Sequence, residues 1–354
     1  MENHTYRVLG VMSGTSLDGI DLALVSFTKE HKWEFNIIVA ATIPYTPDWK
    51  KKLSQGINLD PEKLQDLDED YTSHLANVIT NFIDQHEIVD LDAICSHGHT
   101  IKHEPHNGLT LQIGNLPELA EFTGHTVVCD FRVQDVAMGG QGAPLVPVGD
   151  ELLFSEYKYC LNLGGFANVS SSIDGNRIAF DICAVNTVLN HYAEKLGMEY
   201  DKNGDIARQG RLNPKLLEKL EALPFYKSPP PKSLGIEYVN KEILPLIDSL
   251  ETDIPSVLRT YTQHIALQIS NELGTDPTAE VLVTGGGCLN TFLIQQIKKM
   301  TLTNLVIPSK ELINYKEALI FAFLGVLKLR DEINVYSSVT GAESDHSSGE
   351  IYLP

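Results

Sequence analysis

The sequence has little of what a secreted, membrane-bound or nucleic-acid-binding protein needs. It has no run of about 18 apolar residues that could span a membrane, and its N-terminus lacks the basic and apolar regions of a signal peptide. Positive charge is scarce, because 27 Lys and Arg stand against 47 Asp and Glu, for a net charge of −20. This balance disfavours nucleic acids and anionic membranes as partners. An anionic substrate would therefore have to be bound by local donors and a metal ion.

Cysteine is also sparse, and its spacing excludes a disulfide or metal framework. The count is odd, there is no CxxC pair, and the positions are Cys95, Cys129, Cys160, Cys183 and Cys288. We therefore expect reduced thiols and a cytoplasmic location. The densest histidine cluster matches no standard zinc spacing, so we expect no zinc site at His97, His99, His103 and His106.

The length of 354 residues and the apolar content of 43% fit a globular protein of two domains. Apolar patterning predicts two rounds of three strands, each followed by helices. The expected strands are 8–12, 22–27 and 33–41 in the first round, and 157–163, 166–172 and 177–180 in the second. A helix is expected over 61–86, with Asp60 as its cap. This pattern favours an α/β fold of two related domains with a cleft between them.

The turn after the first strand is the most informative segment. Its two glycines and three hydroxyls can bring backbone and side-chain donors to a phosphate, so we assign nucleotide binding to Gly14, Thr15, Ser16, Leu17, Asp18, Gly19, Ile20 and Asp21. It is no Walker loop, because no Gly-Lys-Ser/Thr follows. Asp18 is the better candidate to hold Mg²⁺, directly or through water, while Asp21 could serve only to order the turn. An ordinary Gly/Asp hairpin is the alternative.

Two later glycine turns are candidates for the rest of a nucleotide site. Asn162, Gly164 and Gly165 end a strand and could form a second phosphate turn, or only a hairpin. Gly285, Gly286 and Gly287 follow a strand and could leave room for a flat adenine, or only pack a strand against a helix.

The segment Asp130-Phe131-Arg132 ends a buried strand, where α/β folds point side chains into a ligand crevice. A guanidinium there suits a carboxylate through two parallel hydrogen bonds. The alternative is a structural pair between Arg132 and Asp135. The glycine-rich loop at 139–142 is expected to be mobile and to lie between the domains.

Motifs along nearly the whole chain resemble those of the 1,6-anhydro-N-acetylmuramic acid kinases of bacterial cell-wall recycling. They are Ser13-Gly14-Thr15-Ser16-Leu17-Asp18-Gly19, Ser96-His97-Gly98-His99-Thr100 (Ser-His-Gly-Gln-Thr in the family), Gln112-Ile113-Gly114, Asp130-Phe131-Arg132, Gly139–Pro147, Asn162–Asn168, Phe180-Asp181, Pro229–Ser233 and Gly285–Gly287. The resemblance implies two actin-like (ribonuclease H-like) domains with an interdomain catalytic cleft. We expect them at 1–134 and 135–330, with a tail at 331–354.

The resemblance also implies an activity and its residues. An ATP- and Mg²⁺-dependent kinase would phosphorylate the anhydro sugar as water opens its ring, and a homodimer is compatible with the family. Asp181 would be the catalytic base, and the sugar would contact His97, Gly98, Asp130, Arg132 and Asn186. For Asp181, capping of the next helix is the alternative.

Two stretches depart from the family pattern. Ile182-Cys183-Ala184-Val185 replace Thr-Gly-Pro-Gly, and Ile236 replaces an Arg. The first change puts bulkier apolar groups where the family has a compliant polar turn, and it could reshape the sugar site. The departures leave open a kinase for a related amino sugar. A non-catalytic nucleotide- or sugar-binding relative is the alternative from a different class.

Overall fold

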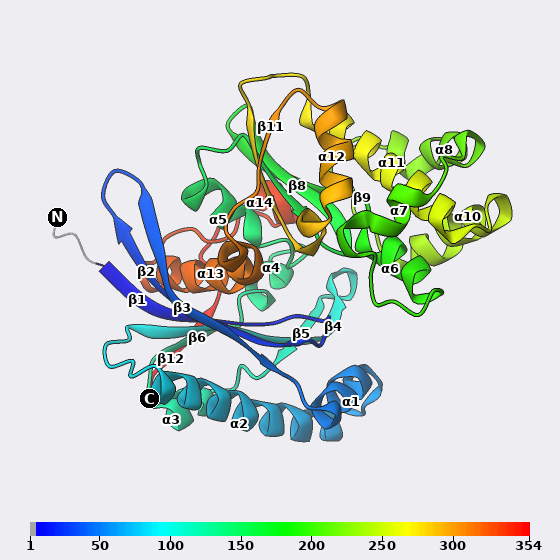
Figure 1. Cartoon of the computed structure of the whole chain (residues 1–354). Helices are drawn as coiled ribbons and strands as arrows, with labels where there is room; N and C mark the ends of the chain where they lie inside the picture. The colour runs from blue at the N-terminus through cyan, green and yellow to red at the C-terminus, as the bar shows by residue number, and fades with distance from the viewer. Residues whose placement is uncertain (1–4) are drawn as a thin grey trace. The chain divides into compact units, whose positions relative to one another are not determined.

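The structure, a computed structural model, describes residues 5–354 and divides into two compact units (Figure 1). Unit 1 contains the described residues up to Leu153 together with Tyr315–Pro354, and unit 2 contains Phe154–Asn314. These units differ from the sequence-based boundaries at 134 and 330. Residues 135–153 and the chain from 315 onward pack with unit 1, because the last long helix and the segment after it complete its sheet.

Unit 1 is built on a seven-stranded sheet in the order β12-β6-β4-β1-β2-β3, with β5 paired to β4. The first three strands form an antiparallel meander, while β4 runs parallel to β1 and β6 parallel to β4. The strands are β1 (Thr5–Ser13), β2 (Gly19–Lys29), β3 (Trp33–Pro44), β4 (Ala93–Glu104), β5 (Leu109–Ile113), β6 (Val127–Cys129) and β12 (Glu350–Tyr352).

Helices cover both faces of this sheet (Figure 1). They are α1 (Pro47–Gln55), η1 (Gly56–Asn58), α2 (Pro61–Gln85), η2 (Pro105–Asn107), α3 (Glu118–Thr123), α4 (Val133–Ala137), α5 (Val146–Leu153), α13 (Lys310–Leu329) and α14 (Ser337–Thr340). α2 begins as expected, since the Asp60 carboxylate accepts a hydrogen bond of 3.0 Å from the backbone N–H of Lys63. Its apolar stripe packs against the meander in one core cluster.

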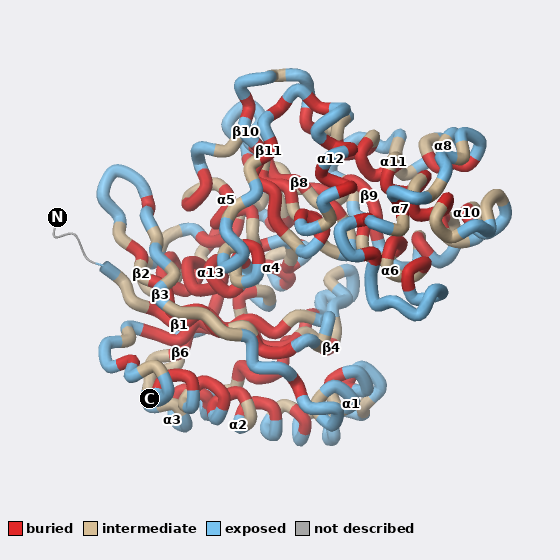
Figure 2. Tube along the Cα trace, viewed as in Figure 1, coloured by how far each residue is buried: buried red, intermediate tan, exposed pale blue. Residues whose placement is uncertain are grey.

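The opposite face of the sheet is covered by α13, whose middle is fully buried (Figure 2). Gly10 permits this contact, because a Cβ atom there would lie 2.0 Å from the carbonyl oxygen of Ala318. The rings of Phe27 and Phe323 meet with centroids 5.2 Å apart. α13 is therefore part of the unit 1 core, which explains why the division expected near residue 330 differs from the compact units.

Unit 2 repeats the same strand order, β11-β10-β7-β8-β9, with an antiparallel meander followed by two parallel strands. Its strands are β7 (Tyr159–Leu163), β8 (Phe166–Ile173), β9 (Asn176–Ala184), β10 (Glu280–Thr284) and β11 (Asn304–Val306). Three antiparallel strands plus two parallel ones, found twice, are the topology of ribonuclease H-like domains. The expected α/β class with two such domains is confirmed.

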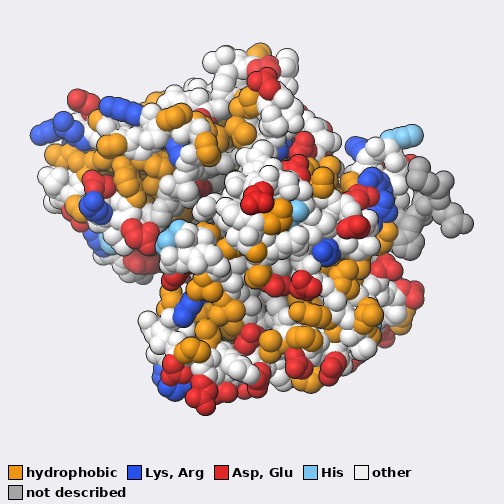
Figure 3. Space-filling model, turned by 180° about the vertical axis from the view of Figure 1, so that it is seen from behind, with side chains coloured by type: hydrophobic (Ala, Val, Ile, Leu, Met, Phe, Trp, Pro, Cys, Tyr) orange, Lys and Arg blue, Asp and Glu red, His pale blue; other side chains and the backbone are white. Residues whose placement is uncertain are grey.

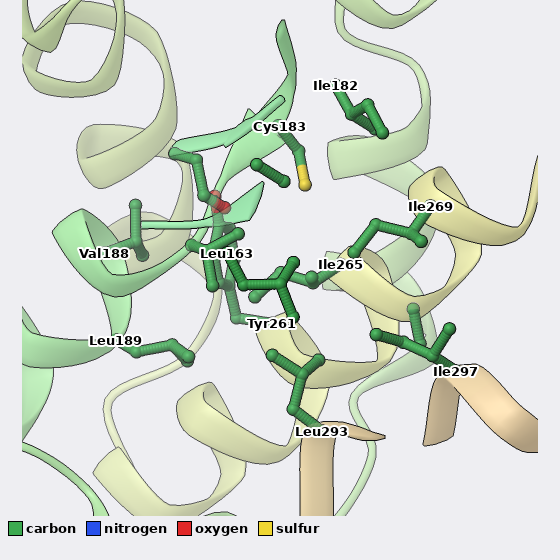
Figure 4. Close-up of a cluster of buried hydrophobic side chains, with 14 of the residues drawn as sticks. Leu163, Ile182, Cys183, Val188, Leu189, Tyr261, Ile265, Ile269, Leu293 and Ile297 are labelled. Atoms are coloured by element: carbon green, nitrogen blue, oxygen red, sulfur yellow. The ribbon is translucent and has the colours of Figure 1, made fainter. Parts of the chain in front are cut away.

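The helices of unit 2 pack around α11, which lies in the core (Figure 4). They are α6 (Asn186–Glu194), η3 (Lys202–Gly204), α7 (Asp205–Gln209), α8 (Pro214–Glu221), η4 (Pro224–Lys227), α9 (Ile236–Tyr238), η5 (Val239–Ile243, a π-helix), α10 (Leu244–Leu250), α11 (Ile254–Leu273), η6 (Gly286–Leu289) and α12 (Thr291–Met300). Side chains from β7, β9, α6, α11 and α12 meet there, among them Leu163, Cys183 and Tyr261 (Figure 4).

Acidic side chains are spread over the visible face rather than gathered in one patch (Figure 3). Within residues 5–354, no helix is long and apolar enough to cross a membrane. The five cysteines are buried thiols.

Candidate active site

The turn between β1 and β2 in unit 1 is compact and partly exposed. The backbone N–H of Leu17 donates to the carbonyl of Gly14 at 3.3 Å, and Leu17 adopts a left-handed φ of 59°. Thr15, Ser16 and Asp18 are exposed, whereas the side chain of Ile20 is fully buried in the core. Ile20 can therefore offer a nucleotide only its backbone.

Gly19 fixes where the turn re-enters the sheet. A Cβ atom at this position would lie 2.4 Å from the carbonyl oxygen of Ile43, so β2 approaches β3 too closely for any other residue. The turn thus leaves the sheet at a defined point, with Thr15, Ser16 and Asp18 exposed to solvent.

The two carboxylates of the turn form a donor set that suits a hydrated divalent cation. Asp21 Oδ1 accepts a hydrogen bond of 2.5 Å from the Thr42 hydroxyl. Burial raises the pKa of Asp21, and the nearby Asp18 carboxylate raises it further. Two oxygen ligands of this kind fit Mg²⁺, which commonly keeps several waters. Over the described part of the chain, no three His, Cys, Asp or Glu side chains gather as a metal cluster.

His97, within β4, and Arg132, three residues after the end of β6, meet through their side chains. Arg132 Nε donates to His97 Nε2 at 2.9 Å, and Arg132 Nη1 donates to the carbonyl of Gly142 at 2.5 Å. Because His97 Nε2 accepts, the ring proton lies on Nδ1 and is donated to the carbonyl of Gly98 at 2.9 Å. Burial lowers the pKa of His97 well below its usual value, and Arg132 lowers it further. His97 is therefore a neutral ring that orients the guanidinium.

Phe321 and Glu317 of α13 complete the surroundings of Arg132. The His97 ring packs on Phe321 with centroids 4.5 Å apart, and the Arg132 guanidinium lies 5.9 Å from the same ring. Burial lowers the pKa of Arg132 to about 10, while the carboxylates of Glu317 and Asp135 act in the opposite direction. The sequence analysis did not single out Phe321 or Glu317. Both lie on a helix whose mostly apolar sequence indicates only a buried core helix.

The alternative pairing of Arg132 with Asp135 is not found among the ion pairs of the described residues. Asp135 is fully buried, and its carboxylate accepts from the Gly142 N–H at 2.6 Å and the Thr340 hydroxyl at 2.7 Å. The Gln141 N–H donates to the Thr340 carbonyl at 2.8 Å. The glycine-rich loop is thus hydrogen-bonded within unit 1, at Gly142 and at Gln141.

Asp130 and Gly98 have backbone conformations that explain their residue types. Asp130 follows β6 with a φ of 57°, and burial together with Glu350 and Asp68 raises its pKa to about 6. Gly98 has a φ of 71°, and a Cβ there would lie 2.6 Å from the carbonyl oxygen of Ile113. Gly98 is thus needed for the packing of β4 against β5, whatever it contacts in a substrate.

Asp181 in unit 2 is held by a neighbouring segment of chain. The strand expected to end at Phe180 continues as β9 through Asp181 to Ala184. Asp181 Oδ2 accepts from the Leu234 N–H at 2.8 Å and from the Ser233 hydroxyl at 3.2 Å, while its own N–H donates to the Lys232 carbonyl at 2.9 Å. Helix α6 begins only at Asn186 and has no side-chain cap. The capping alternative for Asp181 is therefore wrong.

The electrostatics of Asp181 favour a base. Burial raises its pKa, and the hydrogen bonds from Leu234 and Ser233 offset part of that effect. Lys232 does not neutralise it, because the Lys232 ammonium lies 3.5 Å from Glu272 and over the rings of Phe225 and Phe180. Lys232 thus anchors the segment that holds Asp181.

The departure from the family pattern at 182–185 faces inward. All four side chains, Ile182 to Val185, are fully buried in the core of unit 2 (Figure 4 labels Ile182 and Cys183). The four side chains pack in this core and are closed to solvent, so they do not themselves line an exposed surface of unit 2. Ile236, the other departure, is exposed.

The two glycine turns of unit 2 lie against each other. At Gly285, whose φ is 79°, a Cβ would lie 2.4 Å from Asn162 Oδ1, and at Gly287 it would lie 2.9 Å from the Leu163 carbonyl oxygen. Asn186 Nδ2 donates to that carbonyl at 3.3 Å. The structure thus places Asn186, predicted to bind sugar, beside the glycine turns.

Comparisons with known proteins point to one family over nearly the whole chain. A family model described as anhydro-N-acetylmuramic acid kinase matches residues 6–354. The anhydro-N-acetylmuramic acid kinase of Pasteurella multocida is 35% identical over 372 residues, covering 99% of this chain and 98% of that protein. The enzyme of the same name from Haemophilus influenzae is 34% identical over 374 residues, with 97% of each covered.

Likeness to solved structures is weaker. A ROK family glucokinase from Streptomyces griseus, in complex with glucose and AMPPNP, aligns with 90% of this chain and 98% of its own. The identity is 11% and the TM-score is 0.40.

Proposed function

This chain belongs to the anhydro-N-acetylmuramic acid kinase family, and we propose that it phosphorylates 1,6-anhydro-N-acetylmuramic acid with ATP while water opens the anhydro ring. The products are N-acetylmuramic acid 6-phosphate and ADP. One observation carries the proposal: Asp181 is a partly buried carboxylate with one oxygen fixed by two donors. Among the described residues, no hydrogen bond reaches its other oxygen, Oδ1.

The proposed reaction balances with Asp181 as the base. Oδ1 takes a proton from water, and the water oxygen bonds to C1 of the sugar. The bond between C1 and O6 breaks, and O6 takes the γ-phosphoryl group of ATP as ADP leaves. The second water proton stays on the new C1 hydroxyl. Because burial raises the pKa of Asp181, its carboxylate is a stronger base than an exposed one.

Arg132 is proposed to bind the lactyl carboxylate of the sugar. Its Nε and one Nη1 proton are already used by His97 and Gly142, which hold the guanidinium in one plane. The remaining Nη1 and Nη2 protons can form two parallel hydrogen bonds to a carboxylate. His97 therefore acts through Arg132, and we propose the same region of unit 1, with Gly98 and Asp130, as the sugar side.

The nucleotide is proposed to contact the β1–β2 turn of unit 1 and the glycine turns of unit 2. Exposed hydroxyls at Thr15 and Ser16 can donate to phosphate oxygens. Asp18 and Asp21 would hold Mg²⁺, directly or through water, and the ion would offset phosphate charge. The buried thiols fit a cytoplasmic site for this reaction.

A kinase for a related amino sugar is the second candidate. It rests on Ile236 alone, because the change at 182–185 lies in the core. A non-catalytic relative is disfavoured, since Asp181 and the turn carboxylates are all present.

The deciding experiment uses ATP and the anhydro sugar in ¹⁸O water, with mass spectrometry of the product. We expect a phosphorylated sugar with one ¹⁸O at C1. A phosphorylated product that keeps the anhydro ring would show a kinase without hydrolysis. No phosphorylated product would overturn the proposal. Unlabelled N-acetylmuramic acid 6-phosphate, kept in the same water for the same time, corrects for exchange at C1.

A further inference from the structure

Four buried polar side chains form a hydrogen-bonded chain beneath the β1–β2 turn. The Tyr71 hydroxyl lies 2.5 Å from that of Tyr45, which lies 2.6 Å from the Ser13 hydroxyl, and Ser13 Oγ lies 2.8 Å from His99 Nδ1. The four side chains come from α2, the end of β3, the end of β1 and β4. Each residue is less than 10% exposed. None of these contacts has a role in the reaction proposed above.

The number of protons gives the chain a direction. Each hydroxyl has one proton, and the fully buried Tyr71 hydroxyl donates to no carbonyl or carboxylate within residues 5–354. If the chain ran from His99 to Tyr71, the last proton, on the Tyr71 hydroxyl, would be buried without an acceptor, which is unfavourable. In the opposite direction, Tyr71 donates to Tyr45, Tyr45 to Ser13, and Ser13 to His99 Nδ1. No hydroxyl proton is then left without an acceptor. The one remaining proton, on His99 Nε2, lies on an atom that is not among the enclosed, unpartnered polar atoms of residues 5–354.

This direction requires a neutral His99 with its proton on Nε2. Burial lowers the pKa of His99 to about 4, so the ring is neutral near pH 7. His97, two residues earlier, has the opposite tautomer, since its Nδ1 donates to the Gly98 carbonyl. Neighbouring rings on one strand thus hold their protons on different nitrogens.

Tyr45 connects the chain to both ends of the turn. Its hydroxyl bonds to Ser13, the residue before the turn, and its backbone N–H donates to the Asp18 carbonyl at 3.4 Å. The ring of Tyr45 packs near those of Tyr71 and His99, with centroids 6.4 and 6.5 Å apart. A shift of Tyr45 would therefore move both ends of the turn together.

We propose that Tyr45 and His99 are positioning residues, whose one-way hydrogen-bonded chain presets the β1–β2 turn for the phosphates of the nucleotide. The direction of the chain stands on the geometry of unit 1 alone. Its effect on the nucleotide rests on the proposed kinase function. The two parts have separate tests.

The direction is tested by ¹⁵N NMR of the histidine rings in the full-length wild-type protein, with His99→Gln used to assign the His99 signals. We expect the Nε2–H tautomer, unchanged between pH 6 and 8. The Nδ1–H tautomer, or titration of His99 in this range, would overturn the proposal. This result does not depend on activity.

The effect on the nucleotide is tested by steady-state kinetics. Tyr45→Phe removes both hydrogen bonds of the Tyr45 hydroxyl, to Ser13 and from Tyr71, and should raise the KM for ATP roughly three- to tenfold, with kcat and the sugar KM within about twofold. His99→Leu should behave alike, whereas His99→Gln, whose amide oxygen can still accept from Ser13, should stay close to wild type. The matched control is Tyr192→Phe, which loses a 2.9 Å bond to Asp248 in unit 2.

Equal changes in Tyr45→Phe and Tyr192→Phe would overturn the positioning role, because a general loss of stability would then explain both. If the wild-type protein does not phosphorylate the sugar at all, the kinase function fails. The NMR result still decides the direction of the chain in that case.

Discussion

The two units share a strand order but support their first turn by different means. In unit 1 the turn after β1 rests on side chains, a chain of hydroxyls that ends at His99. In unit 2 the turn after β7 rests on the absence of side chains, because Gly285 and Gly287 bring β10 against Asn162 and Leu163. A hydrogen-bonded support can lose one bond and relax, whereas a steric support tolerates no added atom. We therefore expect the two turns to differ in their sensitivity to mutation, although the two units share a topology.

The third strand of each meander also differs. In unit 2 the third strand, β9, carries Asp181, while in unit 1 the third strand, β3, carries Thr42, whose hydroxyl donates to Asp21 of β2. Chemistry is thus expected to depend on unit 2, and recognition of the sugar carboxylate on unit 1. Mutations in the two units should separate kcat from KM.

The largest effect is expected for Asp181→Asn. The amide has nearly the same size but cannot take a proton from water, so kcat should fall about 10²- to 10⁴-fold. ATP binding, followed by titration with a fluorescent nucleotide, should be unchanged. A kcat within about threefold of wild type would remove Asp181 from the mechanism and with it the assignment of chemistry to unit 2.

The next largest effect is expected for Arg132→Ala. Loss of a charge-assisted pair should be unfavourable by roughly 1.5–3 kcal/mol, which raises the sugar KM about 10- to 150-fold and leaves the ATP KM nearly unchanged. The control substrate is an anhydro sugar without the lactyl group. If wild type and variant discriminate equally between the two sugars, Arg132 does not bind that carboxylate.

The steric support of unit 2 can be tested by Gly285→Ala against Gly286→Ala. Gly285 has a left-handed φ of 79° and no room for a Cβ, whereas nothing lies within 4 Å of a Cβ at Gly286. The first change should lower the free energy of unfolding by about 1–3 kcal/mol from the backbone alone and raise the ATP KM. The second should change stability by less than about 0.5 kcal/mol. Thermal unfolding and kinetics measure both, and equal losses would contradict the steric support.

The smallest effect is expected for Ser233→Ala, which removes one of the two donors to Asp181 Oδ2. Both donors favour the charged carboxylate, so losing one should raise the pKa of Asp181 further. Because the base acts only when deprotonated, the acid limb of kcat/KM should move to higher pH, with the plateau little changed. If the acid limb of kcat/KM does not move, Ser233 does not affect the pKa of Asp181.

Local signals in the sequence predicted much of this molecule. The meanders, the cap of α2 at Asp60 and the glycine turns at Asn162 and Gly285 all depend on residues close together in the chain or on strand ends. Asp181 was found through the family motif, but its strand was expected to end at Phe180, four residues before its actual end at Ala184. β9 continues past Asp181 because the residues that follow, Ile182 to Val185, belong to the core of unit 2. A run of four apolar residues does not by itself show whether it faces the core or a ligand site.

Contacts between distant residues could not be predicted. Asp135 accepts from Thr340, over 200 residues later, and this contact anchors a glycine-rich loop whose composition suggested mobility. The tail looked polar and irregular, yet β12 pairs with β6 and Ser348 donates to the Phe131 carbonyl at 2.7 Å. Neither pairing leaves a periodic signal in the sequence. Because of these contacts, unit 1 includes chain segments beyond the boundary expected at residue 134.

The discontinuity of unit 1 has a consequence for synthesis on the ribosome. Unit 2 is one continuous stretch of the chain. Its strands and helices therefore leave the ribosome one after another and can fold as a unit. Unit 1 must wait, because α13 and β12 are made after unit 2, and until then one face of its sheet and one edge strand lack their cover. The half that is translated first is therefore completed last. During that interval, the exposed edge of β6 is the part of the nascent chain most open to pairing with another molecule.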